Sequence, residues 1–246
     1  MPRGPAPTDP EISVVVPVRD EAGAAPALAR EISQAFAGRR FELLFVDDAS
    51  RDDTRAALSA LKADIPQLRI LVHPRNAGQS RAIRTGVLAA RGGVIVTLDG
   101  DGQNDPADGP GLVDALLAGP PGLALVGGER VKRQDSAAKK LASRVGNGVR
   151  RRLLSDTAND TGCGLKAFRR EAFLRLPYFD HIHRYLPALM LREGYQVAFR
   201  PVTHRHRQTG VSKYTNLGRL AVSLSDLFGV MWLKSRSRDP GGVEEV

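Results

Sequence analysis

The most constraining feature of this 246-residue chain is an apolar run at 94–98 that ends abruptly in Asp99-Gly100-Asp101-Gly102-Gln103. A β-branched run of this length predicts a buried parallel strand whose carboxyl end opens onto a ligand crevice. Because glycine lets the backbone curl, Asp99, Asp101 and Gln103 can turn toward one hard divalent cation, Mg²⁺ or Mn²⁺. Such a cation completes its shell with water and substrate phosphates, so we expect a nucleotide diphosphate as ligand. The alternative is an ordinary surface turn, since Asp and Gly are the usual turn residues.

The same arrangement occurs three times earlier in the chain. Apolar runs at 12–18, 41–46 and 68–73 each end in polar residues and are followed by a helical pattern. Four strands alternating with helices predict right-handed βαβ units in a parallel sheet, whose strand carboxyl ends gather the ligand. No G-x-G-x-x-G follows the first strand and no G-x-x-x-x-G-K-[ST] occurs, which argues against a dinucleotide dehydrogenase or a P-loop protein.

The second half of the chain predicts a fifth strand, two more helices and a final strand around a glycine-rich stretch at 159–169. These predicted elements are a strand at 122–127, helices at 136–154 and 182–193, and a strand at 196–200. An apolar segment at 217–233 is interrupted by polar residues, which predicts an amphipathic helix rather than a membrane span. That helix either packs on the domain or lies on a lipid surface.

The formal net charge of +9 calls for a negatively charged partner, and the charge is unevenly placed. Between 129 and 152, nine Lys or Arg stand against two acids, a local net charge of +7. An anionic membrane surface, a phosphorylated substrate and nucleic acid all carry the complementary charge, and a solvated helix face is the plain alternative. We rank nucleic acid last, because aromatic residues are only 5% of the chain and do not interleave with the basic run. A single cysteine, Cys163, suits a reducing cytoplasm.

Five motifs, in order, resemble the family 2 inverting glycosyltransferases of the dolichol-phosphate mannose synthase type. They are Pro17-Val18-Arg19-Asp20-Glu21, Asp47-Asp48-Ala49-Ser50, Asn76-Ala77-Gly78, Asp99 to Gln103, and the loop from Arg207 to Tyr214. The resemblance covers roughly 11–215. It implies an α/β GT-A fold, here a single domain with a mostly parallel central sheet. It also implies a nucleotide-sugar donor, a divalent cation and a polyprenyl phosphate acceptor at the cytoplasmic face of a membrane.

Carried over to this sequence, the resemblance assigns candidate roles to individual residues. Pro17, Asp20 and Glu21 would line the nucleoside pocket, Asp47 would meet the base or ribose, and Asp99, Asp101 and Gln103 would bind the metal. The donor and acceptor phosphates would lie among four basic residues, and Asp160 is the acid of the glycine-rich stretch. The four basic residues are Arg130, Arg144, Arg207 and Lys213.

The chemistry of the acceptor decides which groups would be catalytic. A divalent cation held by Asp99 and Asp101 would neutralise the charge that grows on the departing diphosphate. A phosphate monoester is largely ionised at neutral pH, so arginines such as Arg207 could position it without a general base. A saccharide or other hydroxyl acceptor would need a base, and Asp160 is the candidate for that role.

The expected organisation is an N-terminal arm at 1–10, the GT-A domain at 11–215, a surface helix at 216–236 and a tail at 237–246. We expect a cytoplasmic protein that associates peripherally with the cytoplasmic face of the membrane. The sequence does not decide between guanosine and uridine donors. It also leaves open whether a separate membrane protein anchors the enzyme.

Overall fold

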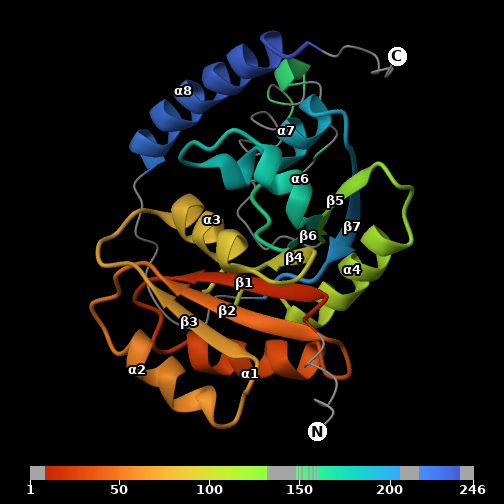
Figure 1. The fold of residues 1–246 in the computed structure, drawn as a ribbon. Coiled ribbons are helices and arrows are strands. Elements are labelled where there is room, and N and C mark those ends of the chain that lie inside the picture. Colours follow the sequence, from red (N-terminus) through yellow and green to blue (C-terminus); the bar gives the residue numbers. More distant parts are fainter. Residues whose placement is uncertain are drawn as a thin grey trace, which may run out of the picture.

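The central element of the computed structural model is one seven-stranded sheet covered by helices on both faces (Figure 1). The structure describes residues 9–131, 148, 150, 152–154, 156, 158, 160–205 and 216–238. The strands are β1 (Ile12–Val18), β2 (Phe41–Asp47), β3 (Leu68–Val72), β4 (Val94–Thr97), β5 (Leu123–Arg130), β6 (Lys166–Arg169) and β7 (Gln196–Val202). Their order across the sheet is β3-β2-β1-β4-β6-β5-β7.

The sheet is parallel except at one strand. β1 pairs in parallel with β2 and β4, β2 with β3, and β5 with β7. β6 runs antiparallel to both of its neighbours, β4 and β5. The four predicted βαβ strands are therefore confirmed, and the start of β6 lies at the edge where the other strands end.

The helices divide between the two faces of the sheet. The longer helices are α1 (Ala25–Ala35), α2 (Thr54–Ser59), α3 (Gln79–Ala89), α4 (Gly109–Leu117), α6 (Arg170–Arg175), α7 (Leu186–Arg192) and α8 (Asn216–Ser235). Short 3-10 turns are η1 (Ala60–Lys62), η2 (Pro106–Asp108) and η3 (Ile182–Arg184). Figure 1 shows α1 and α2 on one side of the sheet and α3, α6, α7 and α8 on the other.

Strand alternation explains why the sheet needs helices on both sides. Val14 and Val16 of β1 belong to the core under α1 and α4, whereas Val15 belongs to the core under α3, α6 and α7. Since every residue of β1 is buried, this strand reads as a continuous apolar run instead of an alternating one.

Two predicted segments differ in detail from the structure. The glycine-rich stretch at 159–169, for which no strand was predicted, ends in β6 and is followed by α6. The single helix predicted at 182–193 is the 3-10 turn η3 followed by α7. Most of the helix predicted at 136–154 lies outside the described residues, as do 1–8 of the arm and 239–246 of the tail.

Candidate active site

Two loops that follow neighbouring parallel strands are tied together at one edge of the sheet. The Asp20 carboxylate after β1 accepts a hydrogen bond from the backbone N–H of Arg51 after β2, at 2.7 Å. The backbone N–H of Asp20 donates to Ser50 Oγ at 2.9 Å, and that of Glu21 to Thr54 Oγ1 at 2.8 Å. Asp20 adopts a left-handed backbone (φ 51°), a conformation that Asp tolerates better than most residues. The predicted nucleoside-pocket residues Asp20 and Glu21 therefore lie beside the loop that follows Asp47.

Gly100 brings the loop that follows β4, residues 99–103 and here called the acidic loop, against the end of β1. A Cβ atom on Gly100 would lie 2.7 Å from the carbonyl oxygen of Pro17 and 2.6 Å from Val18 Cγ1. Only glycine allows two stretches of backbone to approach this closely. Pro17 thus contributes through its backbone to the same edge of the sheet as the acidic loop.

Two adjacent aspartates at the end of β2 have different surroundings. Asp47 is buried, and its Oδ1 accepts the backbone N–H of Ser50 at 2.9 Å. Asp48 is also buried, and its carboxylate accepts four hydrogen bonds from the loop between β3 and α3. The donors are His73 Nδ1 (2.7 Å), Asn76 Nδ2, and the backbone N–H groups of Ala77 and Gly78 (both 2.8 Å). Asp48 holds this loop in place, a role that the sequence reasoning did not assign.

Asp99 sits between α3 and the glycine-rich stretch. Its Oδ1 accepts a hydrogen bond from Gln79 Nε2 at 2.7 Å. On another side, a Cβ atom on Gly164 would lie 2.3 Å from Asp99 Cγ and Oδ2, so only glycine leaves room for this carboxylate. Burial and then the charge of Asp101 raise the pKa of Asp99, while Lys166, the hydrogen bond from Gln79 and Arg130 lower it in part. The two predicted metal carboxylates are thus close enough to repel one another.

Asp101 faces a shallow pocket between the acidic loop and α1. Its Oδ1 accepts the backbone N–H of Gln103 at 3.1 Å. The pocket is also lined by Gly102, by Glu31 of α1 and by Arg205, but not by Asp99. Arg205 in the pocket lining pairs with Glu31 at 2.5 Å and with Asp105 at 2.7 Å.

The donor atoms at this edge fit a hard divalent cation. Asp99 and Asp101 offer two carboxylates and Gln103 an amide oxygen, which is the oxygen-only set that Mg²⁺ or Mn²⁺ accepts. Across the described ranges, no three His, Cys, Asp or Glu residues are grouped so as to hold a metal. One or two carboxylates with substrate phosphates are the usual protein site for Mg²⁺, whereas a structural zinc site needs four ligands.

Arg130 and Asp160, predicted separately as a phosphate ligand and a candidate base, form one ion pair. Arg130 Nε and Nη2 donate to the two oxygens of Asp160 at 2.6 and 2.7 Å. Both side chains are mostly buried, at 16% and 9% exposed. Arg130 also acts electrostatically on Asp99, which places the pair near the predicted metal carboxylates. The fork is therefore a buried cationic group beside the predicted metal carboxylates.

Lys166 is a buried cation next to the same group, and the sequence reasoning did not single it out. It is 4% exposed, and its Nζ donates to the carbonyl oxygen of Cys163. Burial lowers the pKa of Lys166, while Cys163 and Asp99 raise it in part. Its presence on β6, opposite Thr97 of β4, could be found only from the strand pairing.

One arginine of the basic run at 129–152 has a structural role. Arg150 is buried and donates to Asp156, so it belongs to the core. The predicted phosphate ligands Arg144, Arg207 and Lys213 lie outside the described residues. The last described residue before Arg207 is Arg205, whose backbone N–H donates to the carbonyl of Gln103 at 2.9 Å. The chain therefore passes the acidic loop two residues before Arg207.

Comparison with known proteins agrees with this geometry. Residues 13–176 match the model of glycosyl transferase family 2. The chain is 33% identical over 237 residues to a dodecaprenyl-phosphate galacturonate synthase of Rhizobium johnstonii, covering 94% of this chain and 69% of that protein. It is 35% identical over 208 residues to an undecaprenyl-phosphate 4-deoxy-4-formamido-L-arabinose transferase of Klebsiella pneumoniae, covering 83% of this chain and 63% of that protein. The chain thus spans about two thirds of the length of these curated relatives.

A solved structure shares the fold at lower sequence identity. The glucosyl-3-phosphoglycerate synthase of Mycobacterium tuberculosis, crystallised with Mn²⁺, uridine diphosphate and glucosyl-3-phosphoglycerate, superposes with a TM-score of 0.68. It is 22% identical, and the match covers 94% of this chain and 82% of that one. The expected GT-A-like α/β fold is therefore confirmed. With a family model that matches most of the sequence and relatives above 30% identity, the chain belongs to glycosyl transferase family 2.

Proposed function

We propose that this protein transfers a sugar from a nucleotide-sugar donor to a polyprenyl phosphate, with inversion at the anomeric carbon. The observation that carries the proposal is the grouping of the buried Arg130–Asp160 fork with Asp99 at the carboxyl edge of the sheet. The relatives named above act, by their names, on dodecaprenyl and undecaprenyl phosphate. A phosphate acceptor matches the excess of arginine and lysine in this chain.

The donor side uses the two tied loops and the acidic loop. The nucleoside lies against Pro17, Asp20, Glu21 and Asp47, and Asp99, Asp101 and Gln103 hold a divalent cation, Mg²⁺ or Mn²⁺. When bound, the cation neutralises the charge of the departing nucleoside diphosphate. The mycobacterial synthase, crystallised with Mn²⁺ and uridine diphosphate, supports this donor class.

The hydrogen bonds of Asp160 bear on which kind of acceptor receives the sugar. A hydroxyl acceptor requires a general base with an oxygen aimed at the proton that it removes. Both oxygens of Asp160 accept from Arg130 instead, so the carboxylate orients the guanidinium. A phosphate acceptor arrives already ionised and needs oriented cations rather than a base. Asp160 therefore supports a phosphate acceptor over the saccharide alternative, with Arg130, Arg144, Arg207 and Lys213 as the cations that receive it.

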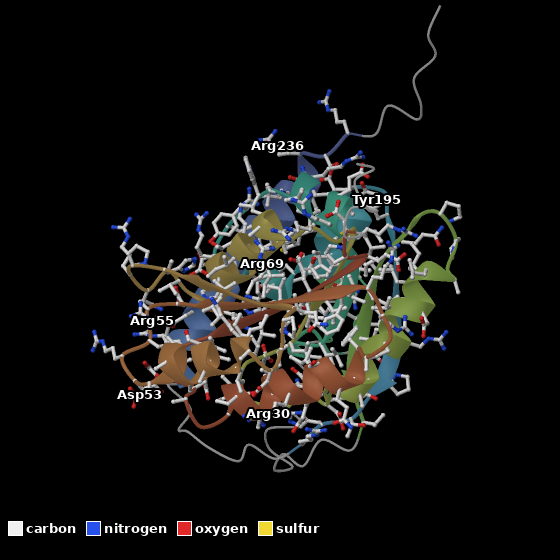
Figure 2. All side chains as sticks on the ribbon, turned by 60° about the horizontal axis from the view of Figure 1, so that its bottom comes forward. Arg30, Asp53, Arg55, Arg69, Tyr195 and Arg236 are labelled. Carbon is white, nitrogen blue, oxygen red and sulfur yellow. The ribbon has the colours of Figure 1, made fainter. Side chains whose placement is uncertain are left out.

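A lipid acceptor also accounts for the exposed face of α8. Three large apolar side chains at positions i, i+4 and i+8, Leu224, Phe228 and Trp232, are 48%, 65% and 59% exposed. The opposite side of the helix, with Leu227 and Val230, is buried in the core. Lys234 lies in the last turn of the helix and Arg236 follows its end, and Figure 2 places Arg236 on the side of the molecule away from Arg30 and Asp53.

An apolar stripe next to basic residues is typical of a helix that lies on an anionic membrane surface. No helix among the described residues is long and apolar enough to cross a bilayer. We infer that α8 holds the enzyme peripherally at the cytoplasmic face, alone or with a membrane-protein partner.

The direct test is transfer to a lipid. Purified protein is incubated with Mg²⁺ or Mn²⁺, undecaprenyl phosphate and a panel of radiolabelled UDP- and GDP-sugars, and the organic phase is counted. A labelled lipid that mild acid hydrolyses, as expected of a glycosyl phosphate, supports the proposal. Transfer to saccharide acceptors, with none to the lipid, would replace it with the hydroxyl alternative.

A further inference from the structure

Gln79 is the first residue of α3, and its side chain reaches Asp99 in the loop that follows β4. Its Nε2 donates to Asp99 Oδ1 at 2.7 Å, a short and well-formed hydrogen bond to a carboxylate. Gln79 follows Gly78, whose φ of 87° is the left-handed conformation that turns the chain into the helix. The side chain is therefore aimed at Asp99 by the way that α3 begins.

The backbone on both sides of Gln79 is fixed by buried groups. On the amino-terminal side, the carboxylate of Asp48 accepts the N–H groups of Ala77 and Gly78 at 2.8 Å. On the carboxy-terminal side, Ser80 is fully buried, and its hydroxyl is hydrogen-bonded to His183 Nδ1 at 2.7 Å. Gln79 thus has little freedom to move away from Asp99.

Gly164 restricts the same carboxylate from a second direction. The close contact between the two residues leaves no space for a Cβ atom, and the Gly164 carbonyl is held by Thr97 Oγ1 at 2.9 Å. The Asp99 carboxylate is therefore held between the amide of Gln79 and the backbone of Gly164.

We propose that Gln79 is a positioning residue: it occupies Oδ1 of Asp99 with a hydrogen bond and so leaves Oδ2 to bind the divalent cation. Gln79 itself touches neither cation nor substrate. The inference rests on the proposed metal site, and it adds that the geometry of that site is set from α3. Outer-shell partners of metal ligands commonly contribute 10- to 100-fold to metal affinity.

The test measures metal binding without turnover. Mn²⁺ is titrated into the full chain, with no donor or acceptor, and the free ion is followed by electron paramagnetic resonance. Gln79→Met keeps the length of the side chain but cannot donate, and it should weaken Mn²⁺ binding about 10-fold. Gln67→Met is the matched control, because Gln67 is exposed at the opposite end of the sheet, before β3, and should bind as wild type.

A second measurement separates positioning from a general structural defect. In steady-state assays, Gln79→Met should raise the Mn²⁺ concentration for half-maximal rate while the KM for the donor at saturating Mn²⁺ changes less than about 3-fold. Thermal unfolding of both variants checks that the fold is intact. If wild type binds Mn²⁺ and Gln79→Met binds it within 2-fold of wild type, the positioning role is overturned and the proposed function stands. If wild type itself binds no Mn²⁺, the positioning role is overturned, while the proposed function is still judged by transfer to the lipid.

Discussion

Arg130 and Asp160 meet as a two-pronged ion pair at 2.6 and 2.7 Å, although 30 positions separate them in the chain. The carboxylate uses both oxygens on the guanidinium, and it also lies 3.4 Å from the backbone N–H of Arg130. A planar guanidinium held in this way cannot rotate freely, so its remaining donors point in one fixed direction. This relationship connects the end of β5 to the glycine-rich stretch and gives the first prediction.

Arg130→Lys should preserve the charge but lose the fork. A lysine can reach only one carboxylate oxygen, and a hydrogen bond to a charged group contributes about 1.5 to 3 kcal/mol. We therefore expect the KM for the polyprenyl phosphate to rise roughly 10- to 100-fold, with a smaller change in the KM for the donor. Arg169→Lys is the control, because Arg169 donates to the carbonyl of Leu123 at the far end of β5. Equal effects on the two KM values would argue against an acceptor role.

Asp160→Asn separates orientation from base catalysis. The amide keeps the shape and still accepts from Arg130 through one oxygen, so transfer to a phosphate acceptor should fall only about 10-fold. A general base would lose its function altogether, a loss of about 100-fold or more. The measurement is kcat with undecaprenyl phosphate against pH. Loss of the acidic limb of the pH profile, where a general base would become protonated, together with near-complete inactivation, would return Asp160 to the role of base.

Gly164→Ala should damage the metal site with little effect on the fold. The new Cβ atom would lie 2.3 Å from the Asp99 carboxylate, which must then move out of place. We expect the Mg²⁺ concentration for half-maximal rate to rise about 10-fold. Gly111→Ala in α4 is the control, since nothing lies within 4 Å of its added Cβ, and it should stabilise the helix by roughly 0.5 to 1 kcal/mol. A normal Mg²⁺ dependence in Gly164→Ala would show that Asp99 does not bind the cation.

The stability of the protein should fall as the pH drops below about 6.5. Burial, and then the charges of Arg184 and Lys166, hold the pKa of His183 well below its usual value. The unfolded chain therefore binds a proton near pH 6.5 that the folded chain refuses. This difference reduces the free energy of unfolding by up to about 1.4 kcal/mol per pH unit until the folded pKa is reached. Urea unfolding at pH 7, 6 and 5 should give a shallower decline for His183→Asn than for wild type, and parallel declines would contradict it.

The exposed stripe of α8 should control binding to lipid. Phe228→Ser combined with Trp232→Ser removes two large apolar side chains, each contributing about 1.5 to 3 kcal/mol when fully buried. Sedimentation with anionic liposomes at low salt should fall more than about 10-fold in this variant and should weaken in wild type as salt rises. Leu117→Ser on α4 is the control, with a side chain that is 53% exposed on the other face of the sheet. Wild-type protein that stays in the supernatant at low salt would count against the membrane surface.

The parallel half of the fold could be predicted because its signals are local. Each of the first four strands is an apolar run with a polar end, and each is followed by a helical pattern, as at 12–18 and 94–98. The carboxyl ends of parallel strands share one edge, so Asp20, Asp47 and Asp99 could be placed there from order alone.

The antiparallel part could not be predicted in this way. β6 has only four residues, Lys166 to Arg169, and two of them are charged. Its residues are buried by pairing with β4 and β5, which are distant in sequence, so no periodicity marks the strand. The contacts that depend on this pairing, from Asp160 to Arg130 and from Gly164 to Asp99, were for that reason beyond sequence reasoning.

The reversed direction of β6 has a consequence for how such an enzyme can diversify. In the proposed function, the donor residues lie between Pro17 and Gln103, and the chain reaches the glycine-rich segment at 160–166, proposed for the acceptor, only afterwards. Because β6 runs antiparallel to β4, the segment that precedes it lies beside the carboxyl end of β4, next to the loop that carries Asp99. Under the proposed function, the residues assigned to the acceptor, from Arg130 to Lys213, all follow those assigned to the donor, so the later part of the gene can vary the recipient of the sugar while the donor residues stay unchanged.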